Sequence, residues 1–136
     1  MTGILAALSL AFTAGAVGGL VNGVVVWLTG DVGLTAALGI NIAPALTPGF
    51  LYSKMVWGGI WGIGLLAPLL GRNLLLRGII WSLAPSLVML LLIFPLRLGQ
   101  GWFGFNLGLL TPAYVLVVNA VWGLAAALWL LAAGRR

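Results

Sequence analysis

The chain of 136 residues contains no cysteine and no histidine, and Asp31 is its one acidic residue. Without cysteine it forms no disulfide and has no thiolate to bind a metal or an iron–sulfur cluster. Without histidine or paired carboxylates it lacks the usual metal ligands and the usual groups for proton transfer. General acid–base and metal catalysis need such groups close together. We therefore expect no cofactor, no metal and no enzymatic activity.

Charge is scarce as well. Only 5% of the residues are charged and 63% are hydrophobic, whereas about a quarter of a typical soluble domain is charged. The outer surface must therefore face hydrocarbon, which makes membrane lipids a partner. Six Lys and Arg residues give a net charge of +5. They are dispersed near expected helix ends, where anionic lipid headgroups are better partners for them than nucleic acid.

Four apolar segments are long enough to cross a bilayer: 3–28, 48–70, 74–96 and 112–133. About 20 apolar residues span a hydrocarbon core of about 30 Å, and the backbone there must satisfy its own hydrogen bonds, so we expect helices. The first segment exceeds the apolar core of about 7–15 residues in a signal peptide. The sequence predicts a single all-α, polytopic membrane domain over residues 1–136.

An internal repeat organises these segments. Residues 39–58 and 104–123 align with two small gaps. Gly39, Asn41, Leu46, Thr47 and Pro48 match Gly104, Asn106, Leu110, Thr111 and Pro112, and further on Lys54, Trp57 and Gly58 match Asn119, Trp122 and Gly123. Each copy holds an outward helix, a loop and a returning helix, so the repeats are parallel. We expect four transmembrane helices as two hairpins, repeat 1 over about 1–70 and repeat 2 over about 74–136, which places Lys54 and Asn119 in equivalent positions.

The basic residues predict the orientation. With four spans, both termini and the middle turn share one side. That side carries Arg72, Arg77, Arg135 and Arg136, and the other carries Lys54, Arg97 and Asp31. Because cytoplasmic loops are enriched in Lys and Arg, we expect both termini in the cytoplasm.

Glycines recur at helical spacing in two of the segments. Gly15, Gly19 and Gly23 share one face of the first, and Gly58 and Gly62 share a face of the second. Small residues let helix backbones approach closely in lipid. The glycines predict helix packing, either inside the chain or between two copies of it.

The two Thr-Pro pairs have a local explanation. Threonine at an N-cap accepts a backbone N–H, and proline is well suited to the first helical position. We expect Thr47 and Thr111 to cap the two returning helices. Asn41 and Asn106 precede these caps. Their amides either tie the outer loops to the helix ends or line a small binding site.

Polar residues inside the apolar segments are the best candidates for a binding site, because exposing them to lipid is costly. They are Asn22, Lys54, Ser82, Ser86 and Asn119. Lys54 lies about 9 Å past its helix start at about 1.5 Å per residue. Its side chain either extends back to the headgroups or faces Asn119 across the bundle, with Asn22 as an acceptor.

Pro85 lies in the middle of the third segment. It removes the N–H that would bond the Trp81 carbonyl, so we expect a kink there. Ser82 or Ser86 is placed to help satisfy the freed group.

Several short motifs resemble the YagU-type family of small bacterial inner-membrane proteins. They are Phe94-Pro95-Leu96, Gly108-Leu-Leu110-Thr111-Pro112 and Asn119-x-Val121-Trp122, with a looser match around Lys54-Met-Val56-Trp57. The resemblance implies a helical fold in the bacterial inner (plasma) membrane. The family has histidine near the positions of Lys54 and Asn119, and this chain departs from it there, which argues against a proton-linked role.

Two functions fit these observations. The first is a structural, accessory or assembly subunit, which packs through its glycine-rich faces in a homo-oligomer or a larger membrane complex. The alternative is a small oligomeric transporter or channel for a neutral or anionic solute, which would use the polar residues of the spans.

Overall fold

The computed structural model describes residues 3–68 and 71–134, and these form helices and loops. Within these two ranges, three helical segments are long and apolar enough to cross a membrane: α1 (Ile4–Asp31), the segment Leu74–Arg97, and α6 (Thr111–Ala132). The prediction of a multi-pass, all-α membrane protein is confirmed at this level. Arg135 and Arg136, on which part of the orientation prediction rests, lie outside the described residues.

The predicted second span, 48–70, is shorter as an α-helix than expected. Helix α3 covers Pro48–Gly62 with 15 residues and continues as one 3₁₀ turn, η1 (Ile63–Leu66). Ala67 is then extended, as is usual for a residue before a proline, here Pro68. Leu69 and Leu70 lie outside the described residues.

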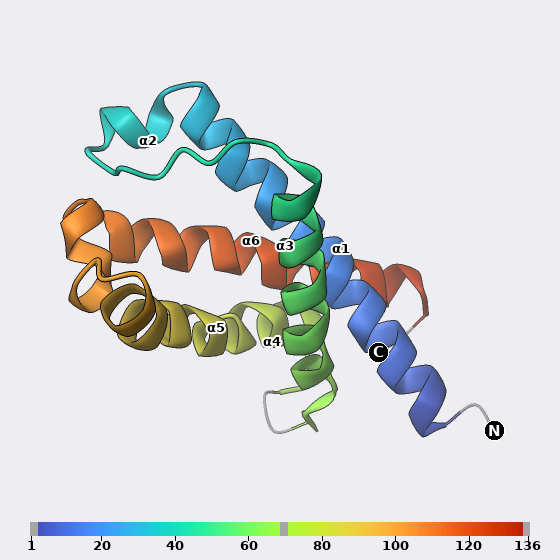
Figure 1. The fold of residues 1–136 in the computed structure, drawn as a ribbon. Helices are drawn as coiled ribbons and strands as arrows, with labels where there is room; N and C mark the ends of the chain where they lie inside the picture. Colours follow the sequence, from blue (N-terminus) through green and yellow to red (C-terminus); the bar gives the residue numbers. More distant parts are fainter. Residues whose placement is uncertain (1–2, 69–70, 135–136) are drawn as a thin grey trace.

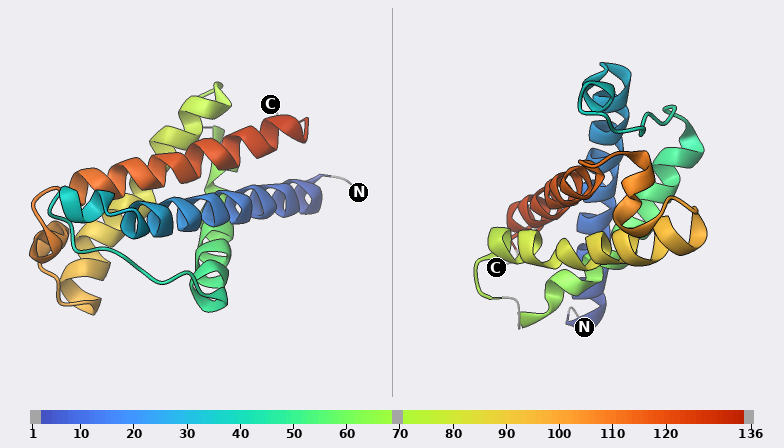
Figure 2. Two further views of the ribbon diagram at one scale, coloured as in Figure 1. Left: turned by 90° about the horizontal axis from the view of Figure 1, so that it is seen from above. Right: turned by 90° about the vertical axis from the view of Figure 1, so that its left-hand side faces the viewer.

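The helices form two groups, α1 with α3 and the segment Leu74–Arg97 with α6 (Figure 1). Helix α1 packs mainly on α3 and α6, and α4 (Leu74–Trp81) packs on α6. In Figure 2, α1 and α6 lie side by side and run in opposite directions, while α3 crosses α1 steeply. The start of α1, the end of η1 and the end of α6 lie toward one end of the molecule. The loops after α1 and before α6 lie toward the other end.

Glycine makes the crossing of α1 and α3 possible. A Cβ added at Gly15 would collide with the carbonyl oxygen of Gly58, and one at Gly19 would collide with that of Lys54. A Cβ at Gly62 would meet the backbone of Ala11 and Gly15. These glycines are buried inside the chain, so here they serve an internal contact. Gly23 faces the stem of Lys54, 3.2 Å from its Cγ if a Cβ is added.

The second group is joined by a glycine pair that the sequence analysis did not single out. A Cβ on Gly78 of α4 would strike the carbonyl oxygen of Gly123 on α6, and a Cβ on Gly123 would strike that of Gly78. The backbones of α4 and α6 therefore touch directly. Alanine is too large for either position.

The two predicted caps differ. Thr47 is the N-cap of α3, and its hydroxyl accepts the Phe50 N–H at 3.1 Å, as expected. The cap predicted at Thr111 is wrong: Leu110 is the N-cap of α6. The Thr111 N–H donates to the Gly108 carbonyl, so the turn begins one residue earlier and the threonine lies inside the helix. Its hydroxyl is buried and has no hydrogen-bond partner among the described residues.

The α-helix is interrupted near Pro85, where we expected a kink. Helix α4 ends at Trp81, α5 covers Leu83–Val88, and a π-helix, η3 (Met89–Arg97), follows. The Ser86 hydroxyl donates to the Ser82 carbonyl at 2.8 Å, and the Ser82 hydroxyl to the Ile79 carbonyl at 2.6 Å. The serines therefore satisfy carbonyls beside the break, not that of Trp81.

The two outer loops touch each other. They carry short helices, α2 (Leu34–Ala37) and η4 (Trp102–Leu107). The Asn41 N–H donates to the Leu107 carbonyl at 2.7 Å, and Gly108 packs on the carbonyl of Gly39. Asn41 and Asn106 are exposed, and their side-chain amides form no hydrogen bond within residues 3–68 and 71–134. The backbone, not these amides, joins the loops.

Candidate functional site

A cavity of about 540 Å³ lies between α3 on one side and α5 with η3 on the other, with α1 and α6 at its base. Its polar and charged side chains come from all four walls: Asn22 from α1, Ser53 and Lys54 from α3, Arg97 from η3 and Asn119 from α6. The remaining lining is largely apolar and aromatic.

A hydrogen-bonded chain runs across the base of the cavity. The Asn22 side chain is only 4% exposed, and its Nδ2 donates to the Val118 carbonyl at 2.7 Å. A longer contact of 3.5 Å joins the same Nδ2 to Asn119 Oδ1. Asn119 Nδ2 donates to Ser86 Oγ at 3.0 Å. Buried polar groups in lipid need such partners, and this chain ties α1, α6 and α5 together.

Lys54 is half-buried, and its side chain follows the cavity wall. Its stem lies against Gly23, which has no side chain to displace it. Its ammonium lies 5.6 Å from the centre of the Phe50 ring, one helical turn toward the start of α3. The side chain therefore combines both arrangements that the sequence left open: the stem faces the interior, and the charge turns toward the outer end of the helix.

Three tryptophans frame the cavity in different ways. Trp122 is buried, and its Nε1 donates to the Gly15 carbonyl at 3.0 Å, which fixes α6 on α1. Trp61 accepts the Trp81 Nε1–H on its carbonyl at 2.7 Å, and the two rings lie 6.0 Å apart. Trp57 is 58% exposed and lines the open side.

The structure brings together three of the six predicted polar residues, Lys54, Asn22 and Asn119, on one cavity. Ser86 lies directly behind it, bonded to Asn119. Asn41 and Asn106 belong to the outer loops and do not line the cavity. Arg97 was missed as a site residue. The available signal was its position: apart from Lys54, it is the one basic residue expected on the outer side.

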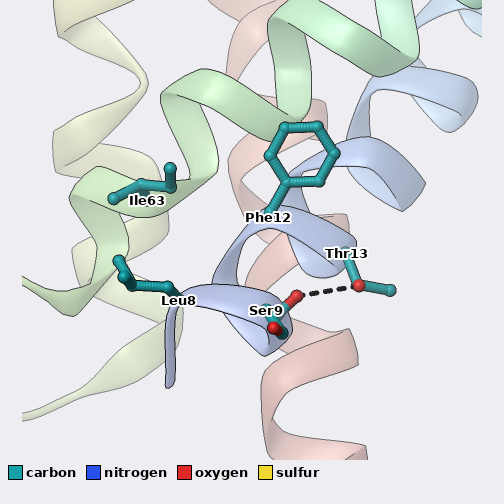
Figure 3. A pocket seen from close by; sticks show the side chains of 5 residues that line it. All are labelled: Leu8, Ser9, Phe12, Thr13 and Ile63. Atoms are coloured by element: carbon teal, nitrogen blue, oxygen red, sulfur yellow. Dashed lines mark hydrogen bonds between the residues drawn. The ribbon is translucent and has the colours of Figure 1, made fainter. Parts of the chain in front are cut away.

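A second hollow, of about 440 Å³, lies on the outside of the bundle (Figure 3). Five residues of α1 and η1 line it, namely Leu8, Ser9, Phe12, Thr13 and Ile63. The Thr13 hydroxyl donates to the Ser9 carbonyl of its own helix at 2.8 Å. This hollow is open and carries no charge, so the cavity at Lys54 is the better candidate site.

The charged side chains of the cavity indicate the kind of molecule that it can bind. Within the described residues, no group of three or more acidic, histidine or cysteine side chains is placed to hold a metal ion. The lining has two cations and no carboxylate, so it suits an anion. No family model, curated protein or solved structure matches this chain.

Proposed function

We propose that this chain is a non-catalytic, multi-pass protein of the bacterial inner membrane that binds and transports a small neutral or anionic solute. The observation that carries the proposal is that Lys54, Asn22 and Asn119 line one cavity inside an otherwise apolar bundle. Intramembrane polar groups gathered on a cavity are typical of solute pathways.

The proposal includes four membrane crossings. Helix α3 is 15 residues long, and η1 adds four residues in a more extended helix. At about 1.5 Å per α-helical residue and about 2.0 Å per 3₁₀ residue, the two reach about 30 Å, the thickness of a hydrocarbon core. This length supports a crossing by α3 and η1, which pairs with α1 as a hairpin.

Equivalent helix contacts support the duplicated hairpin. Gly58 and Gly123 are aligned in the sequence repeat, and each is the close-contact residue of a returning helix. Their partners on the outward helices are Gly15 and Gly78. In both hairpins the outward and returning helices touch backbone to backbone at a pair of glycines, although Gly78 lies only one turn from the start of its helix.

The site residues continue this correspondence. Lys54 and Asn119 both precede the aligned glycines by one helical turn. Lys54 lies against Gly23 of its own hairpin, and Asn119 bonds Ser86 of its own hairpin. Gly39 and Gly104, aligned in the two loops, both adopt left-handed backbone angles, with φ of 74° and 70°.

The proposed orientation keeps both termini in the cytoplasm. Arg77, next to the turn between the hairpins, donates to the carbonyls of Leu65 and Gly71 at 2.8–3.0 Å. Arg72 is exposed beside it. Basic residues at this end favour the cytoplasmic side, and they leave Lys54 and Arg97 toward the opposite side.

An accessory subunit is less well supported. That function needs glycine faces at the surface for docking, whereas Gly15, Gly19, Gly58 and Gly62 are buried in contacts within the chain. A homo-oligomer or a larger complex would have to form through other, lipid-facing residues.

Reconstitution into liposomes tests the transport function. We expect Lys54→Met to reduce flux of a small anion by about tenfold or more, since charge-assisted hydrogen bonds are worth that much in binding. Lys54→Arg keeps the charge and should keep most of the flux. Arg72→Met removes an exposed charge from the opposite end and is the matched control. Equal flux in Lys54→Met and the parent protein, with both folded, would contradict the proposal.

A further inference from the structure

We infer that the occupant of the cavity is an anionic lipid, bound with its phosphate at Lys54 and Arg97 and its hydrocarbon against the cavity wall. This inference goes beyond the proposed function: it names a lipid that the same cavity binds, and the experiment below separates lipid binding from flux of a small solute.

The charge of the cavity favours an anion. Lys54 and Arg97 line it, and no acidic residue does. Asp31, the one acid of the sequence, ends α1 and lies outside the lining. A half-buried ammonium beside hydrocarbon is costly without a counter-charge, and a phosphate between the two cations provides one.

The hydrogen-bond donors that remain free in the cavity also favour an anion. The amide N–H groups of Asn22 and Asn119 are directed to Val118 and Ser86. Across the described parts of the chain, neither the Lys54 ammonium nor the Arg97 guanidinium donates a hydrogen bond to protein. Both are donors only, and guanidinium binds phosphate oxygens in pairs. Lys54 and Arg97, with the hydroxyl of Ser53 beside them, are therefore the lining donors that remain for a bound anion.

The walls favour a lipid over a bare ion. Trp57, Trp61, Met89 and Ile93 line the cavity, and a small hydrated ion would leave this surface in contact with water. A hydrocarbon chain covers it instead. The volume of about 540 Å³ accommodates a headgroup and the first part of an acyl chain rather than a whole lipid.

The cavity also opens toward the bilayer. Trp57 lines it and is 58% exposed, and it lies on α3 beyond Lys54 from the helix start. At that depth the medium outside the helix is hydrocarbon. A lipid can therefore enter from the side, with its chains remaining in the membrane.

Tryptophan fluorescence provides a direct test, because three tryptophans line the site. The purified protein is titrated in detergent with phosphatidylglycerol brominated on its acyl chains, and separately with phosphatidylcholine brominated in the same way. We expect phosphatidylglycerol to quench at about tenfold lower concentration, as for a charge-assisted contact. The double variant Lys54→Met/Arg97→Gln should bind the two lipids alike, whereas Lys54→Arg/Arg97→Lys and Arg72→Met should keep the preference.

Equal quenching by both lipids in the parent protein would overturn the inference, as would a preference for phosphatidylglycerol that the double variant retains. The failure of the proposed function is distinguishable. If the parent shows no lipid preference but conducts inorganic phosphate or acetate in a Lys54-dependent way, the lipid is wrong and the transport function stands. If the preference is present and depends on Lys54 and Arg97 but no flux occurs, the lipid inference stands and the transport function fails. If both the preference and the flux are absent, both proposals fail.

Discussion

At the scale of single residues, buried polar side chains are paired by hydrogen bonds, and helices that touch do so at glycines. Asn22, Asn119 and Ser86 satisfy one another or a neighbouring carbonyl across three helices. Glycine is used where two backbones touch, because no side chain fits between them. These two devices shape the cavity: the first holds its base, and the second sets how closely its walls approach.

The glycine contacts predict a position-specific loss of stability. Gly58→Ala and Gly123→Ala each force a methyl group into the backbone of the facing helix, so each should lower the free energy of unfolding by about 1–3 kcal/mol, as overpacking does. Gly49→Ala is the control, since a Cβ there meets nothing within 4 Å. Thermal unfolding in detergent measures all three. Equal stability of Gly58→Ala and Gly49→Ala would refute the contact.

At the scale of elements, the helix starts and breaks follow local chemistry, but not at every position. The Thr47 cap was predictable because it needs only the residues beside it. Thr111 is also preceded by leucine and followed by proline, but it does not cap. Its N–H donates to the Gly108 carbonyl, and this turn starts the helix one residue earlier in the chain. Local sequence therefore predicted one of two matching helix starts.

The two threonines should respond in opposite directions. Thr47→Ala removes a cap and should destabilise the protein by about 1 kcal/mol. Thr111→Val removes a buried hydroxyl that has no partner in the part of the chain that the structure describes. It keeps the side-chain shape, so it should leave stability unchanged or raise it by about 1 kcal/mol. Chemical denaturation of the two variants in one detergent gives the comparison. A loss of stability in Thr111→Val would show that the hydroxyl has a partner.

The sequence predicted the three long apolar helices and an interruption near Pro85, because length, hydrophobicity and proline act locally. It also predicted that Lys54 and Asn119 are candidates, since polar residues stand out in lipid. It did not predict the pairing of Gly78 with Gly123, nor the part that Arg97 plays in the cavity. Both depend on which helices meet, and a chain with 21 glycines does not mark the pair that touches.

At the scale of the whole molecule, α1 and α6 pack together, the loops after α1 and before α6 are joined, and a charged cavity lies between α3 and η3. Helix α3 packs on α1, and α5 with η3 packs on α6. The space between α3 and the α5–η3 segment is the cavity. The proposed function depends on this arrangement.

Cysteine labelling tests the double hairpin most directly, because the chain has no cysteine of its own. Single cysteines are placed at the exposed positions Asn41, Arg72, Asn106 and Ala133, and intact cells are treated with a membrane-impermeant maleimide. We expect Asn41→Cys and Asn106→Cys to be labelled from outside, and Arg72→Cys and Ala133→Cys only after the membrane is permeabilised. Labelling of Arg72→Cys from outside together with Asn41→Cys would show that α3 and η1 do not cross, and would contradict the account.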